Sequence, residues 1–427
     1  MSDHQTVREL SDRIVGAQTD IRVLESVKWT DDVRVQFFAD GFRRQPIVDR
    51  AYYQRRPLAF NPAELRHRFL RVEADTVKRL GSDSAVSQLL CRTARSYRST
   101  IDLLESRGTA AFGPISSDLY GRPGDSFHQD GPTVLDLADS LDATLLQMEG
   151  PLTGVGVHGS DELLTFSAEE AVIELQARLD ASMGSGQVDV RLDDGLVADA
   201  AAGSKYVKLR ADATFTRRTL ATLEAHEGWV HIGTTLNGLA QPYCTFLGKA
   251  PPPATVTQEG LATLTEILAL RSQPARLRRV VNRIRGIDLV LNGATFVELF
   301  EYLRVEGLDE DEAWQTAARI FRGSVPEGPP FAKDLAYGKG LVLAYSYVRL
   351  ALRQGRPERI PMLFCGKVDL QALGLVNQLF EEGLVESPRF IPEPFRDLHA
   401  LAAQVAFSRF LRELDFDQLV ADSGSPR

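Results

Sequence analysis

The chain has 427 residues, of which 44% are hydrophobic and 25% are charged, and its formal net charge is −9 at pH 7. This composition is typical of a globular protein, and the acidic balance argues against a nucleic-acid partner, because phosphate binding requires a basic face. No run approaches the roughly 18 uncharged apolar residues of a membrane span, and residues 1–23 lack the apolar centre of a signal peptide, so we expect a cytoplasmic protein without a membrane partner.

Periodic apolar residues predict a helical N-terminal region. The apolar positions recur at intervals of three and four, as in amphipathic helices, over residues 7–23, 62–80, 84–106 and 134–147. Gly and Pro punctuate residues 113–124, which predicts a loop. The stretch 150–161 is rich in Gly and turn residues, and it is the predicted boundary between an N-terminal region over residues 1–160 and a catalytic domain over residues 161–420.

After a predicted helix over residues 167–182, two runs show the alternation of apolar and polar residues that is typical of β-strands. They cover residues 188–192 and 206–210, and an Asp-Asp-Gly turn after the first run indicates a small antiparallel sheet. The stretch 205–210 is a candidate for the edge strand along which an extended substrate pairs, and the alternative is a purely structural strand.

The next predicted helix covers residues 216–236, with Thr216 as its N-cap and the Asn237-Gly238 pair as a left-handed C-terminal cap. Helical spacing then returns through the C-terminal third, at residues 256–270, 277–286, 295–306, 310–321 and 340–354. The predicted fold class is therefore mainly α, of the α+β type, with a small antiparallel sheet and a helical C-terminal part.

The hexapeptide 226–231 spells H-E-x-x-x-H and provides His226, Glu227 and His231. It is one residue longer than the zinc-binding H-E-x-x-H motif, and in a regular α-helix positions i and i+5 lie about 140° apart, too far to share an ion. We therefore predict a π-bulge between Glu227 and His231, with Gly228 lowering its steric cost. Histidines on an ordinary helix are the alternative.

A catalytic zinc site usually has three protein ligands and leaves the fourth position to water. Glu259, in the string Gln-Glu-Gly-Leu-Ala on the next predicted helix, is the best candidate for the third ligand, and His128 and His158 are the alternatives. In this arrangement Glu227 would be the general base toward a water that the zinc activates.

The hexapeptide, the Gln-Glu-Gly-Leu-Ala string and the Asn-Gly and Gln-Pro pairs between them resemble the bacterial "QEGLA motif" proteins, which are similar to the eukaryotic tubulin tyrosine carboxypeptidases. The resemblance implies a mostly helical, zincin-like scaffold and a zinc ion held by His226, His231 and Glu259, with Glu227 catalytic. It also implies a metallopeptidase that removes a residue, an aromatic one being a candidate, from the C-terminus of a peptide or protein.

An exopeptidase of this kind must bind a free carboxylate, which a bidentate guanidinium does best. The candidates for substrate binding are Arg319 and Arg322, three residues apart on one helix, together with Lys333 and Tyr337, whose hydroxyl would donate to a developing oxyanion. Solvated helix residues are the alternative. A further basic run either receives an acidic protein tail or forms a solvated face; it comprises Arg271, Arg276, Arg278, Arg279, Arg283 and Arg285.

Two other functions are compatible with the same motif. One is a zinc amidohydrolase that acts on a small molecule, and the other is a regulatory protein that binds a metal without catalysis. A closed site with four protein ligands would favour the second, because no position would be left for water.

Overall fold

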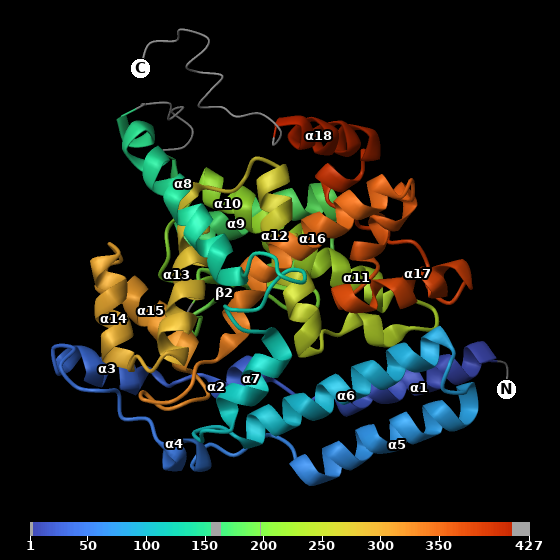
Figure 1. The fold of residues 1–427 in the computed structure, drawn as a ribbon, viewed down its shortest axis with the longest axis horizontal. Coiled ribbons are helices and arrows are strands. Elements are labelled where there is room, and N and C mark those ends of the chain that lie inside the picture. Colours follow the sequence, from blue (N-terminus) through green and yellow to red (C-terminus); the bar gives the residue numbers. More distant parts are fainter. Residues whose placement is uncertain (1–2, 155–163, 197, 412–427) are drawn as a thin grey trace, which may run out of the picture.

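The N-terminal part is helical, as predicted (Figure 1), in a computed structural model that describes residues 3–154, 164–196 and 198–411. The helices of this part are α1 (Asp3–Ala17), α2 (Val23–Val27), α3 (Asp31–Ala39), α4 (Arg50–Gln54), α5 (Pro62–Leu80), α6 (Ala85–Glu105), α7 (Phe112–Tyr120) and α8 (Val134–Gly154). The predictions for α5 and α6 are confirmed almost to the residue. The first predicted helix is shorter than expected, because α1 ends at Ala17.

The predicted loop over residues 113–124 is wrong in its first part, which forms α7. Pro114 lies in the first turn of this helix, where the missing N–H costs no hydrogen bond. Gly113 packs so closely on Pro329 that a Cβ would lie 2.3 Å from the Pro329 Cβ. Here Gly and Pro mark a helix start and a close contact rather than a loop.

Within the described residues, the strands form two small sheets near the middle of the sequence. They are β1 (Thr165–Phe166), β2 (Asp189–Asp193), β3 (Ala200–Ala202), β4 (Tyr206–Arg210) and β5 (Phe215–Thr216). β1 and β5 pair antiparallel, and the other sheet has the order β2-β4-β3. The small antiparallel sheet is confirmed, since β1 pairs antiparallel with β5 and β3 pairs antiparallel with β4. The two predicted runs, β2 and β4, are parallel to each other. β4 is thus a central strand, and the edge-strand prediction for residues 205–210 is wrong.

The rest of the chain is helical, as predicted. Its helices are α9 (Ala168–Met183), α10 (Arg217–Leu223), the π-helix η2 (Glu224–Ile232), α11 (Gly233–Leu239), α12 (Pro252–Leu268), α13 (Pro274–Leu291), α14 (Phe296–Val305), α15 (Glu310–Phe321), α16 (Leu335–Arg353), α17 (Leu373–Glu381) and α18 (Leu398–Leu411). The short 3-10 helices are η3 (Thr245–Gly248), η4 (Ala332–Asp334), η5 (Pro357–Arg359), η6 (Pro361–Phe364), η7 (Leu370–Ala372) and η8 (Glu393–Phe395). No helix within residues 3–154, 164–196 and 198–411 is long and apolar enough to cross a membrane.

For the helix predicted over residues 216–236, the N-terminal end is confirmed and the C-terminal end is wrong. Thr216 is the N-cap, since its side chain accepts a hydrogen bond from the Thr219 N–H. The predicted C-cap at Asn237-Gly238 is wrong, because the helix continues to Leu239. Asn237 instead uses its amide to bind the backbone of Phe390, and Gly238 leaves room for the backbone of η3.

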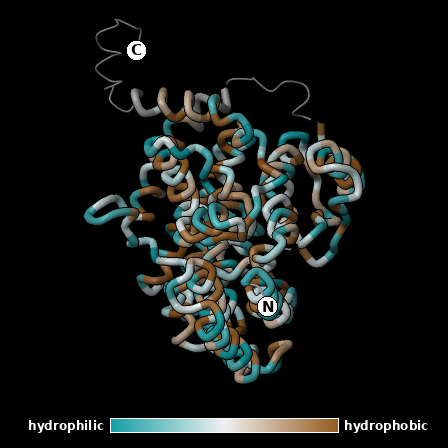
Figure 2. Tube along the Cα trace, turned by 90° about the vertical axis from the view of Figure 1, so that its right-hand side faces the viewer, coloured by the Kyte–Doolittle hydropathy of each residue, from teal (hydrophilic) through white to brown (hydrophobic). Residues whose placement is uncertain are grey.

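The buried apolar residues of the described chain form three hydrophobic cores. α1, α5 and α6 share one core with α12, α16 and α17, whereas α3, α7 and α8 share a second with α13, α14 and α15. The third lies between α9, the sheets and η2. Figure 2 shows teal and brown stretches interleaved along the chain, as amphipathic packing requires. The division into two domains stays a prediction, and most of its boundary lies outside the described residues.

The helices α12 and α16 cross at two glycines. α12 and α16 run side by side through the centre of the molecule (Figure 1), and Gly260 of α12 faces Gly340 of α16. A Cβ built on Gly260 would lie 2.0 Å from the Gly340 carbonyl carbon, so backbone rather than side chain blocks it. The glycine that follows Glu259 therefore lets α12 approach α16.

We expect Gly260→Ala to destabilise the protein by about 1–3 kcal/mol or more, because two helices must separate to admit the methyl group. Denaturant unfolding measures the change. Gly374→Ala in α17 is the matched control, since a Cβ there meets nothing within 4 Å. Equal stability of Gly260→Ala and the wild type would contradict the packing argument.

Candidate active site

The hexapeptide 226–231 lies in the π-helix η2, which continues α10 and is continued by α11. The predicted π-bulge is confirmed and is longer than a single insertion, covering nine residues. Hydrogen bonds from i to i+5 bring residues five apart onto one face, so His226 and His231 lie together with ring centroids 4.8 Å apart. Gly228 makes room for Leu179, whose Cδ2 lies 2.3 Å from where a Cβ would be.

Side chains outside η2 bind the carbonyl groups of the π-helix. The Val230 carbonyl accepts a hydrogen bond from Thr234 Oγ1 at 2.6 Å, and the His231 carbonyl accepts one from Lys367 Nζ at 2.9 Å. Gln258 Oε1 accepts from both donors, at 2.8 Å each. The glutamine that precedes Glu259 thus ties α12 to the part of the helix that carries His231.

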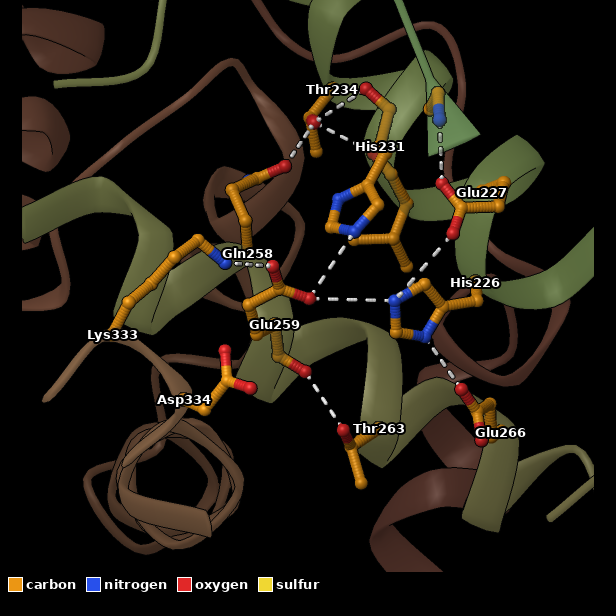
Figure 3. Close-up of polar contacts among 12 residues, drawn as sticks. His226, Glu227, His231, Thr234, Gln258, Glu259, Thr263, Glu266, Lys333 and Asp334 are labelled. Carbon is orange, nitrogen blue, oxygen red and sulfur yellow. Dashed lines mark hydrogen bonds and ion pairs between the residues drawn. The ribbon is translucent and has the colours of Figure 1, made fainter. Parts of the chain in front are cut away.

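Glu259 lies between the two imidazoles (Figure 3). Its Oε2 is 3.4 Å from His226 Nε2 and 3.5 Å from His231 Nε2. A tetrahedral zinc ion with bonds of about 2.0–2.1 Å separates its ligand atoms by roughly 3.4 Å. The Glu259 side chain is only 11% exposed, and its Oε2 has no hydrogen-bond partner among the described residues. A cation bound by these three atoms would account for a buried oxygen that has no hydrogen bond.

His128, one of the two alternative third ligands, does not join this group. His128 lies in an exposed segment, where its Nδ1 contacts the carbonyl of Gln129 at 3.0 Å. His158 lies outside the described residues. The described residues that could together hold a metal are therefore His226, His231 and Glu259.

A buried carboxylate orients the first imidazole. Glu266 Oε1 lies 2.6 Å from His226 Nδ1, and Arg276 Nε donates to Glu266 Oε2 at 2.6 Å. This leaves the His226 Nε2 lone pair for a metal, as in many zinc sites where a carboxylate binds the far nitrogen of a histidine ligand. Burial disfavours the imidazolium, but contacts with Glu259 and Glu266 outweigh it and raise the pKa of His226 to about 10. The site is thus rich in negative charge and suited to a cation.

Glu266→Gln should weaken zinc binding by about 10- to 100-fold, because it removes the carboxylate that orients His226. Competition with a chromophoric chelator measures the affinity. Glu224→Gln is the control, since Glu224 is also a buried carboxylate of η2 but binds Arg271 at 2.7 Å instead of a histidine. An unchanged affinity in Glu266→Gln would show that Glu266 does not hold the ligand.

A strand positions Glu227. Its Oε2 accepts a hydrogen bond from the Ala202 N–H of β3 at 2.9 Å, and its Oε1 lies 4.0 Å from His226 Nε2 (Figure 3). The carboxylate is therefore held beside the three candidate ligand atoms without being one of them. The sequence contained no clear signal for β3, whose three residues are all alanine.

A cavity of about 770 Å³ opens onto this group, and His226 and Glu227 are among the residues that line it. Much of its wall is basic: it includes Arg276, Arg278, Arg279, Arg283 and Arg319. Part of the basic run from α13 therefore faces the cavity rather than bulk solvent alone. Periodicity did not identify which arginines these are, because the partner surfaces come from distant parts of the chain.

The sequence model of the microtubule-associated tyrosine carboxypeptidases matches residues 35–413. The chain belongs to this family. The match covers most of the sequence and confirms the resemblance inferred from the two motifs. Membership of a carboxypeptidase family supports carboxypeptidase-type activity for this chain and a peptide or protein as its substrate. No curated protein matches the chain.

The four predicted substrate-binding residues of this tyrosine carboxypeptidase family member do not all lie in the cavity. Arg319 and Tyr337 line the cavity, and the Tyr337 ring lies 6.3 Å from that of His226. Lys333 Nζ donates to Glu259 Oε1 at 3.1 Å. Arg322 does not line the described cavity, and its Nη2 lies 3.7 Å from Asp334. The structure thus brings Lys333 and Tyr337 to the three candidate metal ligands and places both arginines around Asp334.

Proposed function

We propose that this protein is a zinc carboxypeptidase that removes a C-terminal residue from a peptide or protein, with His226, His231 and Glu259 as the metal ligands. One observation carries the proposal: a buried carboxylate oxygen without a hydrogen bond lies 3.4 and 3.5 Å from two imidazole nitrogens, in a member of a carboxypeptidase family. The name of that family supports tyrosine, or another aromatic residue, as the residue removed.

In the proposed hydrolysis of the peptide bond, the zinc ion and Glu227 have separate roles. Zinc, when bound, would polarise the scissile carbonyl and lower the pKa of a bound water toward about 7. Glu227 takes a proton from the attacking water and passes it to the leaving amine. The Ala202 N–H fixes one Glu227 oxygen, so the other faces the ligand group. Strand β3 therefore fixes the orientation of the Glu227 carboxylate relative to the ligand group.

Other side chains hold the ligands or bind the substrate. We propose that Lys333 acts through Glu259, orienting the carboxylate and offsetting its charge. Tyr337, on the cavity wall beside His226, donates its hydroxyl to the oxyanion that develops at the carbonyl. Arg319 and Arg322 contribute positive charge around Asp334, and Asp334 in turn holds Arg319 through hydrogen bonds of 2.6 and 3.0 Å.

The test is release of free tyrosine by the zinc-loaded full chain from N-acetylated pentapeptides that end in tyrosine, each offered as the free acid and as the C-terminal amide. We expect tyrosine from the acid and much slower cleavage of the amide. Equal rates on acid and amide would favour a general amidohydrolase. No cleavage of any peptide by protein that retains zinc would overturn the proposal in favour of a metal-binding protein without this activity.

A further inference from the structure

Lys367 is a half-buried cation beside the candidate metal ligands, and the proposed chemistry leaves it without a role. Its Nζ donates to the His231 carbonyl at 2.9 Å and to Gln258 Oε1 at 2.8 Å. Thr235 Oγ1 donates to the same carbonyl at 2.7 Å. Within residues 3–154, 164–196 and 198–411, no carboxylate forms an ion pair with Lys367. A poorly solvated ammonium without a counter-charge is costly, and its two acceptors show what it stabilises.

The acceptors around Thr234 outnumber the single proton of its hydroxyl (Figure 3). Thr234 Oγ1 lies 2.6 Å from the Val230 carbonyl oxygen and 2.8 Å from Gln258 Oε1. The His231 carbonyl oxygen lies 3.3 Å from the same hydroxyl. A hydroxyl has one proton to donate, whereas an ammonium has three. Lys367 therefore supplies the donors that Gln258 and His231 cannot both obtain from Thr234.

The backbone around Lys367 is fixed by η3 and α11. The Lys367 N–H donates to the Leu247 carbonyl of η3 at 2.7 Å. Three residues earlier, the Phe364 carbonyl accepts a hydrogen bond from the Asn237 amide of α11 at 2.8 Å. Because α11 directly continues η2, Lys367 is anchored to the same continuous helix whose carbonyl it contacts. The lysine is thus held in place rather than free on the surface.

The contact of Lys367 depends on how η2 is wound. In α-helical winding each residue turns by about 100°, so His226 and His231 would point about 140° apart. Rewinding the helix by one residue before His231 would also rotate its carbonyl by about 100°, away from the anchored Lys367. The hydrogen bond of 2.9 Å therefore belongs to the π-helical form. Because long π-helices are rare, contacts from outside the helix are expected where one persists.

We propose that Lys367 is a positioning residue that maintains the π winding of η2 in the absence of metal, so that His231 already faces His226. The inference rests on the proposed function and adds the residue that preorganises its ligand group. Gln258 extends the effect to the third candidate ligand, because it accepts from Lys367 and directly precedes Glu259 in α12. Lys367 thus links the two helices that carry the ligands.

The first test uses the metal-free full chain and measures amide hydrogen exchange by mass spectrometry. Lys367→Met keeps the length of the side chain and removes its donors. We expect the amides of η2 to exchange about 10-fold faster or more, the effect of losing a hydrogen bond to a charged group, while those of α5 stay unchanged. Lys249→Met is the matched control, since Lys249 lines the same small pocket as Lys367 and makes no side-chain hydrogen bond to η2 within the described part of the chain.

The second test follows the metal site itself. Competition with a chromophoric chelator should show that Lys367→Met binds zinc about 10- to 100-fold more weakly, as for other residues that orient a ligand. The visible absorption of bound Co²⁺, which reports ligand geometry, should change at saturating metal. Lys367→Arg keeps a cationic donor and should restore part of the affinity and of the spectrum. Lys249→Met should leave both at wild-type values.

Gln258→Met decides alone if Lys367→Met does not fold, because it removes the acceptor that joins Lys367 to α12. We expect faster exchange of the η2 amides in that variant as well. Wild-type exchange of η2 in the folded variant, or wild-type zinc affinity in Lys367→Met, would overturn the inference. Lack of metal binding by the wild type would count against the proposed function alone, since the exchange experiment needs no metal.

Discussion

Glu227→Gln should lower kcat for release of a C-terminal residue by about 10²- to 10⁴-fold, the range that one general acid-base group contributes. Glutamine has nearly the same shape and can still accept the Ala202 N–H that holds Glu227 Oε2 at 2.9 Å. It cannot take a proton from water at neutral pH. We therefore expect zinc content and thermal stability close to wild type, and a loss confined to the chemical step.

Single-turnover measurements with saturating peptide isolate that step from substrate binding. Glu224→Gln is the matched control, because it removes another buried carboxylate of η2 whose partners are Arg178 and Arg271. That variant should keep its activity within a few-fold. Wild-type kcat in Glu227→Gln would mean that another group moves the proton.

Glu259→Ala should abolish activity and weaken zinc binding by more than the roughly 10- to 100-fold that changes to ligand-orienting residues cause. It removes one of the three candidate ligands outright. It also leaves Lys333, which is 10% exposed, without the carboxylate that it contacts at 3.1 Å. An unpaired buried charge typically costs about 3–5 kcal/mol, so the metal-free variant should also be less stable than metal-free wild type.

A second change separates these two effects. The double variant Glu259→Ala/Lys333→Met removes the unpaired ammonium, and we expect it to recover stability without recovering zinc. Glu259→Gln keeps an acceptor for Lys333 and should likewise lose zinc while staying closer to wild type in unfolding. If Glu259→Ala retained wild-type zinc affinity, the third ligand would have to be another residue.

The sequence was most informative where a local residue pattern is compatible with only one backbone conformation. Two histidines five residues apart can share an ion only if the helix is wound as a π-helix, and η2 has that form. Thr216 and the apolar periodicity of α5, α6 and α15 likewise specified helices with nearly the observed ends. These features depend on residues close together in the chain.

The remainder depends on contacts between distant segments. Gly113-Pro114 and Asn237-Gly238 have the composition of turns, yet both pairs lie in helices because tertiary packing uses them for close approach and for side-chain hydrogen bonds. β3 is too short and too rich in alanine to be recognised, although its Ala202 holds Glu227. Sequence pattern alone also does not distinguish an arginine that faces the cavity, such as Arg283, from one that pairs with α8, such as Arg285.

The most direct test of the proposed function is the metal content of the purified full chain, measured by mass spectrometry beside His231→Ala. We predict about one zinc per wild-type chain and a loss of that zinc in His231→Ala, with both proteins folded. A folded wild type that neither contains zinc nor takes it up on titration would contradict the metal site and the zinc carboxypeptidase built on it.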